Sequence, residues 1–394
     1  MTNKWLRFVL TVCIVLIGSV TALTGSIVIF PALGSYSQEG DASEDLAISG
    51  GKEILNTGNG SGAEVSSDKN VETGAGKEIE DEQERANKNA ANSATAPLKN
   101  AIAKTVAWYS ANRNLPGQEL WEAYTALWGA GEDLNDAGKW EAGHYWRNEG
   151  PDGLAPDHPG NEHIRYGFML LSVEQDPTDL WGGRNLLAEL AAQQAENGSF
   201  GQLGRHIWAM ELLNIGRELG LDVGSWADQD ARQKAVSWLL NQQNENGSFG
   251  RFSELDFTGW TLITLSYSRD YEGVNDAVHD ALNYLENRQQ EDPGAAGFSG
   301  GDWTDYNANS QAAAISGLVA LGEDLTSPNS RWVRNGETLL DAQLKYQHED
   351  GFFQWTIDNP GDIDLATSQS LIALLDIEHG EYTRHRMARE LSFD

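Results

Sequence analysis

Apolar and polar residues alternate with helical spacing from about Pro97 to the end of the chain. Apolar positions three and four apart predict a helix over 101–112 and a second over 117–131. A short Pro-Gly turn separates the two segments, as expected between antiparallel helices. The pattern therefore predicts a helical hairpin at the start of this region.

A nearly identical turn sequence occurs more than once in the chain. The stretch QQAENGSFG at 193–201 returns as QQNENGSFG at 242–250, and related turns follow. Their glycines recur with a period of about 50 residues, at Gly198, Gly247, Gly297 and Gly351. Each unit therefore predicts a helix, a Gly/Asn/Asp turn that permits positive φ, and a second helix.

The two helices of each unit differ in character. The first is amphipathic with a charged face, and the second is rich in Ala, Gly and Ser. We expect the first to lie outside and the second inside, where neighbouring helices crowd. The Phe after each turn should pack between hairpins, and the Gln before it should bond backbone groups at a helix end.

Such a unit cannot bury its apolar face alone, and stacking of units solves this. Two further hairpins fit upstream, one over 97–131 and a weaker one made of 136–148 and 162–173. Six hairpins give about twelve helices. The sequence therefore predicts an all-α fold over 97–394 in which six hairpins close into an (α/α)6 toroid.

The first 34 residues have a different pattern. Residues 8–30 carry no charge over 23 positions, and Lys4 and Arg7 precede them. Since about 20 apolar residues span a bilayer, we predict a single membrane-spanning anchor within 1–34, with the remaining chain on the extracytoplasmic side of the cell membrane. The alternative is a signal peptide cleaved near 32–34, which would leave a secreted protein.

Residues 35–96 are rich in Gly, Ser, Asn and acidic side chains and show no apolar periodicity. This composition predicts a disordered acidic spacer between the anchor and the helical domain.

Charge and cysteine content exclude several classes of partner. The formal net charge is −32, so the phosphate backbone of nucleic acid would be repelled. The only cysteine is Cys13, which allows neither an internal disulfide nor a Cys-rich metal site. His144, His158 and His163 match no metal motif and are expected in a solvated loop. We therefore expect no metal and no required cofactor.

Several segments carry a resemblance to a known superfamily. KAVSWLLNQQNENGSF at 234–249 resembles the repeat of squalene cyclases, and the hairpins resemble those of protein prenyltransferase β-subunits. The order of ELWEAYTALWGAG, NANSQAAAISGLVALGED and DIDLATSQSLIAL is most similar to secreted bacterial toroid proteins related to vitamin B12 carriers. The resemblance implies an α/α toroid that binds a bulky ligand at the mouth of its ring, and a corrinoid is one candidate.

The resemblance also bears on catalysis. Class II terpene cyclases protonate an alkene with the middle Asp of an Asp-x-Asp-Asp motif, and the segment Asp362-Ile363-Asp364-Leu365 resembles it in part. This implies Asp364, beside Asp362, as a candidate general acid. The alternative is that Asp364 is the N-cap of the last inner helix. Zinc prenyltransferases bind their metal through Asp, Cys and His, so the position of Cys13 argues against that activity.

Aromatic residues on or just before the inner helices are candidates to line a ligand pocket at the ring mouth. The leading prediction is a protein that binds a corrinoid, an isoprenoid or a peptide. One alternative is a terpene-cyclase-like isomerase that uses Asp364, and the other is a non-catalytic surface protein with a structural or interaction role. The predicted ligand-binding residues are Trp121, Tyr124, Trp208, Trp260, Trp303, Asp305, Tyr306 and Trp355.

Overall fold

The computed structural model describes residues 96–111, 121–136, 139–140, 154–157, 160–180, 182–290, 297–299 and 306–393. Within these residues the regular elements are helices, and extended pairing is limited to isolated bridges such as Gln243 with Phe249. The fold of this part of the chain is therefore all-α, as predicted.

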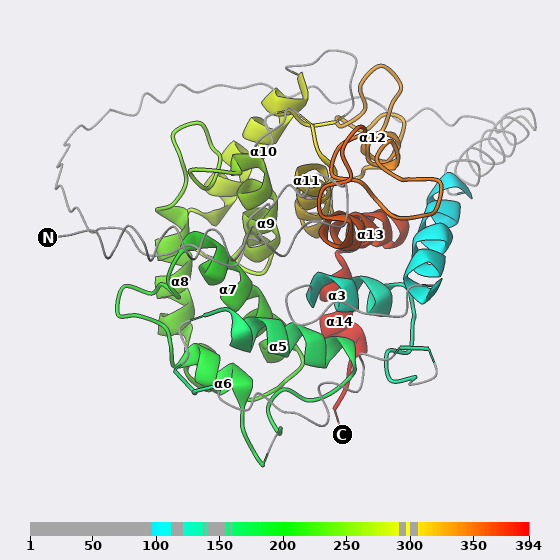
Figure 1. Cartoon of the computed structure of the whole chain (residues 1–394). Coiled ribbons are helices and arrows are strands. Elements are labelled where there is room, and N and C mark those ends of the chain that lie inside the picture. Colours follow the sequence, from blue (N-terminus) through cyan, green and yellow to red (C-terminus); the bar gives the residue numbers. More distant parts are fainter. Residues whose placement is uncertain are drawn as a thin grey trace, which may run out of the picture. The chain divides into compact units, whose positions relative to one another are not determined.

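Six helices form the inner layer of the fold, and each begins after a turn or loop (Figure 1). They are α3 (Trp121–Gly129), α5 (Glu162–Ser172), α7 (Leu203–Glu218), α9 (Glu254–Ser266), α11 (Ala308–Ala320) and α13 (Ile363–His379). Contacts join α3 to α5, α5 to α7, α7 to α9, α9 to α11, α11 to α13, and α13 back to α3. The six helices thus form a closed cycle of contacts.

The remaining helices cover this layer from outside (Figure 1). One spans 96–111, and the others are α6 (Leu186–Ala191), the short 3-10 helix η3 (Gly224–Ala227), α8 (Gln229–Leu240), α10 (Val274–Gln290) and α12 (Leu339–Leu344). The α8 helix buries only Ala235, Val236 and Leu239, whereas α11 buries nearly its whole length. The predicted division into amphipathic outer and apolar inner helices is confirmed.

Glycine sets the closest approach between two inner helices. A Cβ on Gly259 of α9 would lie 2.3 Å from the carbonyl oxygen of Ala313 in α11, and one on Gly317 would lie 2.5 Å from that of Gly259. Only glycine lets these two backbones pack this closely.

A glutamine in three of the repeats ties its turn to the next outer helix. Its side-chain amide donates to the carbonyl of the turn glycine and to a carbonyl in the following helix. The bonds to the following helix run from Gln194 to Ala231 at 2.9 Å, from Gln243 to Ala277 at 2.8 Å, and from Gln347 to Ala101 at 2.9 Å. The last of these joins the fourth repeat to the first described helix.

The turn glycines lie against the same neighbouring helices. Gly198, Gly247 and Gly351 have φ of +90°, +87° and +104°. A Cβ at these positions would lie 2.3–2.4 Å from a backbone carbonyl oxygen of the next outer helix, at Lys234, Asp280 and Lys104 respectively. Both the left-handed backbone and the close approach require glycine.

The phenylalanine after each turn is buried and is held by the inner helix that follows. The backbone N–H groups of these residues donate to a side chain of that helix at 2.9–3.1 Å. The pairs are Phe200 with His206, Phe249 with Thr258, Phe298 with Gln311, and Phe353 with Thr367. The predicted bonding of the turn Gln to backbone groups of a helix is confirmed for three repeats, and the Phe is buried in all four.

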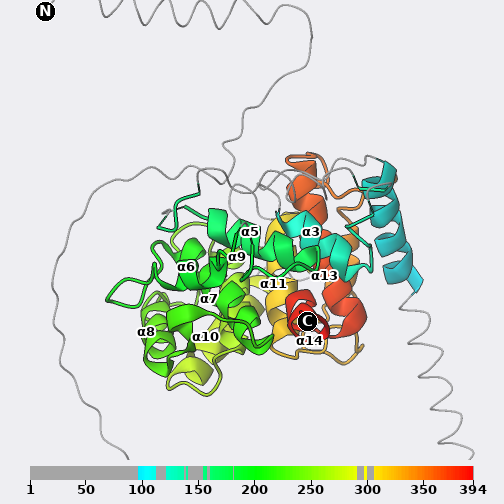
Figure 2. The same cartoon turned by 90° about the horizontal axis from the view of Figure 1, so that it is seen from below.

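A last helix lies outside the hairpin pattern. The chain reverses after α13 at Gly380, where φ is +61°, and α14 (Thr383–Glu390) packs on α3, α7 and α13 (Figure 2). Sequence periodicity did not predict this element.

The predicted membrane anchor and nearly all of the predicted acidic spacer lie in residues 1–95, outside the described residues. Among the helices that are described, none is long and apolar enough to cross a membrane.

Candidate ligand-binding site

Residues from five inner helices and from the start of α14 surround one cavity, which we call the central cavity. Its volume is about 40 Å³. Because a bound water needs roughly 10–15 Å³ measured in this way, the cavity has room for about three waters or one small group. Its lining consists of Trp121, Glu122, Trp208, Glu211, Trp260, Ile263, Ala312, Ala313, Ser316, Gln369, Ile372, Tyr382 and Arg384.

Three predicted ligand-binding residues meet in this lining. Trp121, Trp208 and Trp260 come from α3, α7 and α9. The ring centroids of Trp121 and Trp208 are 5.9 Å apart, and those of Trp208 and Trp260 are 5.5 Å apart. Three of the inner helices, α3, α7 and α9, therefore present neighbouring aromatic rings to the cavity.

Two carboxylates share the cavity with the tryptophans. The Oε2 atom of Glu122 is buried and has no hydrogen-bond partner among the described residues. Burial raises the pKa of Glu122 above its usual range, although hydrogen bonds from its own backbone N–H and from Gln369, and the charges of Arg384 and Arg165, oppose the shift. Glu211 is 2 % exposed and accepts a hydrogen bond of 2.8 Å from the hydroxyl of Tyr382.

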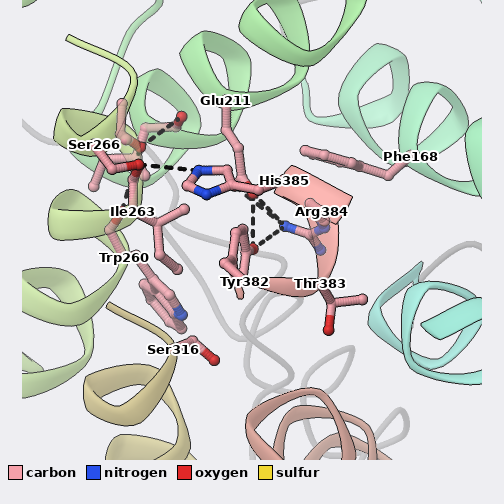
Figure 3. Close-up of polar contacts among 12 residues, drawn as sticks. Phe168, Glu211, Trp260, Ile263, Ser266, Ser316, Tyr382, Thr383, Arg384 and His385 are labelled. Carbon is pink, nitrogen blue, oxygen red and sulfur yellow. Dashed lines mark hydrogen bonds and ion pairs between the residues drawn. The ribbon is translucent and has the colours of Figure 1, made fainter. Parts of the chain in front are cut away.

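Arg384 is the cation that balances Glu211 (Figure 3). Its Nη1 donates to the two carboxylate oxygens of Glu211 at 3.1 and 3.2 Å. Its guanidinium carbon also lies 4.3 Å from the ring centroid of Trp121 and 4.1 Å from that of Phe168, within the range of cation–π attraction. Burial alone would lower the pKa of Arg384, but Tyr382, Glu211 and Glu122 raise it, so the side chain stays charged.

Asp376 of α13 fixes the start of α14. Its carboxylate accepts hydrogen bonds from the hydroxyl of Ser316 at 2.6 Å and from the backbone N–H and hydroxyl of Thr383 at 2.6 and 2.7 Å. Burial raises the pKa of Asp376 to about 7, even though these donors act in the opposite direction. This anchor holds Tyr382 and Arg384 at the central cavity.

The two candidate catalytic aspartates lie at the start of α13. The N-cap is Asp362, which has extended backbone angles and accepts a hydrogen bond of 3.1 Å from the N–H of Leu365. The prediction that Asp364 is the N-cap is therefore wrong, because Asp364 already lies inside the first helical turn. Burial and the charge of Asp362 raise the pKa of Asp364. Neither aspartate is part of the cavity lining described above.

The other predicted ligand-binding residues are spread over the structure. Tyr124 is 1 % exposed in the core of α3, and Tyr306 is half-buried just before α11. The carbonyl of Trp355 accepts a hydrogen bond of 2.8 Å from the N–H of Ala308, and its side chain lies against Gly361. Trp303 and Asp305 lie outside the described residues.

One of the three clustered histidines is described in the structure. His163 is fully buried in α5, and its Nε2 lies 3.0 Å from Oε2 of Glu189, which also pairs with Arg184 at 2.6 Å. The prediction of a solvated loop is therefore wrong for His163, while His144 and His158 lie outside the described residues. Within the described residues, no three His, Cys, Asp or Glu side chains group to hold a metal ion.

The polar members of the cavity were not predicted. Glu211 interrupts the apolar run IWAMELLNIG, and Glu122 stands between aromatic residues in ELWEAY. An acid on an otherwise apolar inner helix was the available signal, since a buried acid needs a partner or a function. No pattern in the sequence pointed to Arg384, because its segment does not belong to any of the repeats.

Comparison of the sequence with protein-family models found no match, and no curated protein matches it either. The functional argument therefore rests on the geometry of the central cavity.

Proposed function

We propose that residues 97–394 form an (α/α)6 toroid that is held outside the cytoplasm by the segment 1–34 and binds a ligand at its centre. The closed cycle of contacts among the six inner helices supports the toroid. The bond from Gln347 to the carbonyl of Ala101 supports closure, because it repeats at the two ends of the domain the link made between internal repeats.

One observation carries the binding function: groups from five inner helices converge on the central cavity. The wall combines three tryptophans with two carboxylates, a glutamine and an arginine. Ligand sites typically combine apolar and aromatic walls with a few polar groups that fix orientation.

The size of the cavity limits how a ligand binds. A volume of about 40 Å³ admits an end group and excludes a whole corrinoid or triterpene. The body of the ligand, whether corrinoid, isoprenoid or peptide, therefore lies at the ring mouth, and only one end of it reaches the tryptophans.

Native mass spectrometry of the full chain in detergent tests this proposal. The protein is purified from its host, and then challenged separately with cobalamin, squalene and a mixture of short peptides. We expect one class to be retained and to be lost in Trp260→Ala. The matched control is Trp238→Ala, which removes a half-buried tryptophan from the outer helix α8.

A bare mass with every ligand class would overturn the binding proposal and favour the structural or interaction role. Equal loss of binding in Trp238→Ala and Trp260→Ala would also count against a site in the central cavity, because the first residue does not line it.

The raised pKa of Asp364 supports a second candidate, a terpene-cyclase-like isomerase. A general acid needs a carboxyl that keeps its proton near the working pH. Incubation with squalene, followed by mass analysis of products, tests this activity. A cyclised product that disappears in Asp364→Asn but persists in the exposed Asp358→Asn would support it, and absence of any product would reject it.

A further inference from the structure

The ligand class can be narrowed further if the central cavity is the binding site proposed above. We infer that the group entering this cavity is a cation, either an ammonium or a guanidinium, at the end of an unbranched chain. The inference rests on the charge, the aromatic wall and the size of the cavity.

Glu122 provides the first argument. Its Oε2 is buried without a hydrogen-bond partner among the described residues, and it belongs to the cavity lining. A buried polar atom left unsatisfied costs about 1–3 kcal/mol, and more if the group is charged. A ligand that donates hydrogen bonds and carries positive charge would remove this cost, whereas an apolar or anionic end group would increase it.

The charges of the lining provide the second argument. Glu122 and Glu211 are its two carboxylates, and Arg384 is its one cation. Arg384 already pairs with Glu211 at 3.1 Å. One carboxylate is therefore left over, and one monovalent cation would neutralise the cavity.

The protein itself shows how its centre holds a cation. The guanidinium of Arg384 lies beside the stacked rings of Trp121 and Phe168 and bonds the carboxylate of Glu211. Trp208, Trp260 and Glu122 line the same cavity, so a second set of aromatic rings and an acid faces this space. Aromatic rings together with a carboxylate suit ammonium and guanidinium groups.

The surroundings also favour positive charge. Four inner helices carry acidic residues in their first turns: Glu122, Glu162, Glu254 with Asp256, and Asp364. The whole chain has a net charge of −32, which attracts cations over distance. Arg165 and Arg384 are the described cations that act on Glu122, and both favour its ionised form.

The size of the cavity determines whether a linear or a bulky cation can enter it. A volume of about 40 Å³ accepts one ammonium or guanidinium, so the chain behind it must be narrow. A free linear amine and the side chain of Lys or Arg in a peptide share this chemistry.

Calorimetric titration of the full chain in detergent tests the inference, with tryptophan fluorescence as a second signal. The probes are agmatine, which carries a guanidinium at one end and an ammonium at the other end of a linear chain, N-butylurea, which is linear and neutral, and the peptide acetyl-Gly-Arg-Gly-amide. We expect one or both cationic probes to bind and butylurea not to bind. Tighter binding of agmatine would indicate a free amine as the source, and tighter binding of the peptide would indicate a side chain.

Two variants test whether Glu122 is the group that binds the cation. Glu122→Gln should weaken binding of the cationic probe about 10- to 100-fold, the range expected for a hydrogen bond to a charged group. Glu254→Gln removes an acid from the first turn of α9 that does not line the cavity, and it should leave the affinity unchanged.

Equal weakening in Glu122→Gln and Glu254→Gln would overturn the inference, because surface charge would then explain the binding. Binding of butylurea as tightly as agmatine, lost in Trp260→Ala, would also reject the cation while leaving the central binding site in place. If no probe binds and native mass spectrometry retains no ligand, both proposals fail.

Discussion

The hydroxyl of Thr105 donates a hydrogen bond of 2.8 Å to the carbonyl oxygen of Gly351, which lies 246 positions further along the chain. Gln347 bonds the same two residues, at 3.0 Å to the hydroxyl of Thr105 and at 3.3 Å to the carbonyl of Gly351. The last repeat is therefore joined to the first described helix by a small network of buried hydrogen bonds. The stability of the domain should depend on this junction.

Substitution of Gly351 tests the close packing at the junction. In Gly351→Ala a Cβ would lie 2.4 Å from the carbonyl oxygen of Lys104, in a residue with φ of +104°. We expect a loss of about 1–2 kcal/mol from the left-handed backbone and a further 1–3 kcal/mol from overpacking. Thermal unfolding measures the total loss.

Gly336→Ala is the matched control for this substitution. Gly336 has φ of +82°, and nothing lies within 4 Å of its Cβ position. In this variant the free energy of unfolding should fall only by the cost of placing Ala in a left-handed backbone, about 1–2 kcal/mol. Equal losses in the two variants would show that the contact with Lys104 carries no energy.

Removal of the Gln347 amide tests the hydrogen bonds separately from the packing. Gln347→Leu removes the amide that donates to the carbonyls of Ala101 and Gly351, and at about 0.5–1.5 kcal/mol for each bond this should cost about 1–3 kcal/mol in urea unfolding. Gln194→Leu makes the same change between internal repeats and should cost a similar amount. Gln233→Leu, on the exposed face of α8, should change stability by less than about 0.5 kcal/mol.

His206 should make the domain sensitive to acid. Its buried Nδ1 accepts a hydrogen bond of 3.1 Å from the N–H of Phe200, so the folded protein requires a neutral ring. Burial lowers the pKa of His206 to about 3, whereas an unfolded His titrates near 6.5. The unfolded state therefore binds the extra proton between these pH values, and stability falls as pH drops through that window.

Urea unfolding at pH 7 and pH 5 measures this effect, which should be about 2 kcal/mol for one proton. His206→Gln should reduce the pH dependence by about this amount without unfolding the protein, because Gln311 accepts the equivalent bond from Phe298 in another repeat. His279→Gln, an exposed position on α10, should leave the pH dependence as it is. An unchanged pH dependence in His206→Gln would contradict the assignment.

The ion pair between Arg384 and Glu211 should be strongly coupled. Arg384→Met leaves a buried carboxylate unpaired and should cost about 3–5 kcal/mol. The double variant Arg384→Met with Glu211→Gln should be more stable than Arg384→Met alone, which a double-mutant cycle detects. Arg389→Met breaks an exposed pair with Glu381 and should cost less than about 1 kcal/mol.

The repeating part of the fold could be predicted because its signals are local. The turn glycines, the Gln before them and the Phe after them each need one residue type at a fixed place, so the spacing shows them directly. The closure into a toroid and the membrane anchor stay predictions. The N-cap of α13 was misplaced by two residues, because cap geometry depends on backbone angles at Asp362 that composition does not show.

The cavity was predictable only in part. Trp121, Trp208 and Trp260 follow the helical period and were found. Glu211 and Arg384 form a pair although they are 173 positions apart in the sequence. Arg384 lies in α14, a helix that the repeat pattern does not predict. No local pattern encodes such a contact, so charge balance inside the cavity could be seen only in three dimensions.

The junction between Thr105 and Gly351 also sets an order of events when the protein is made. The helix over 96–111 leaves the ribosome before any other described element, yet its partner turn near Gly351 comes about 240 residues later. Until that turn is made, the hydroxyl of Thr105 and the carbonyl of Ala101 lack the hydrogen bonds with it that they have in the finished fold. Incompletely packed segments promote aggregation in growing chains, so we expect this helix to be a segment that a holding chaperone would cover.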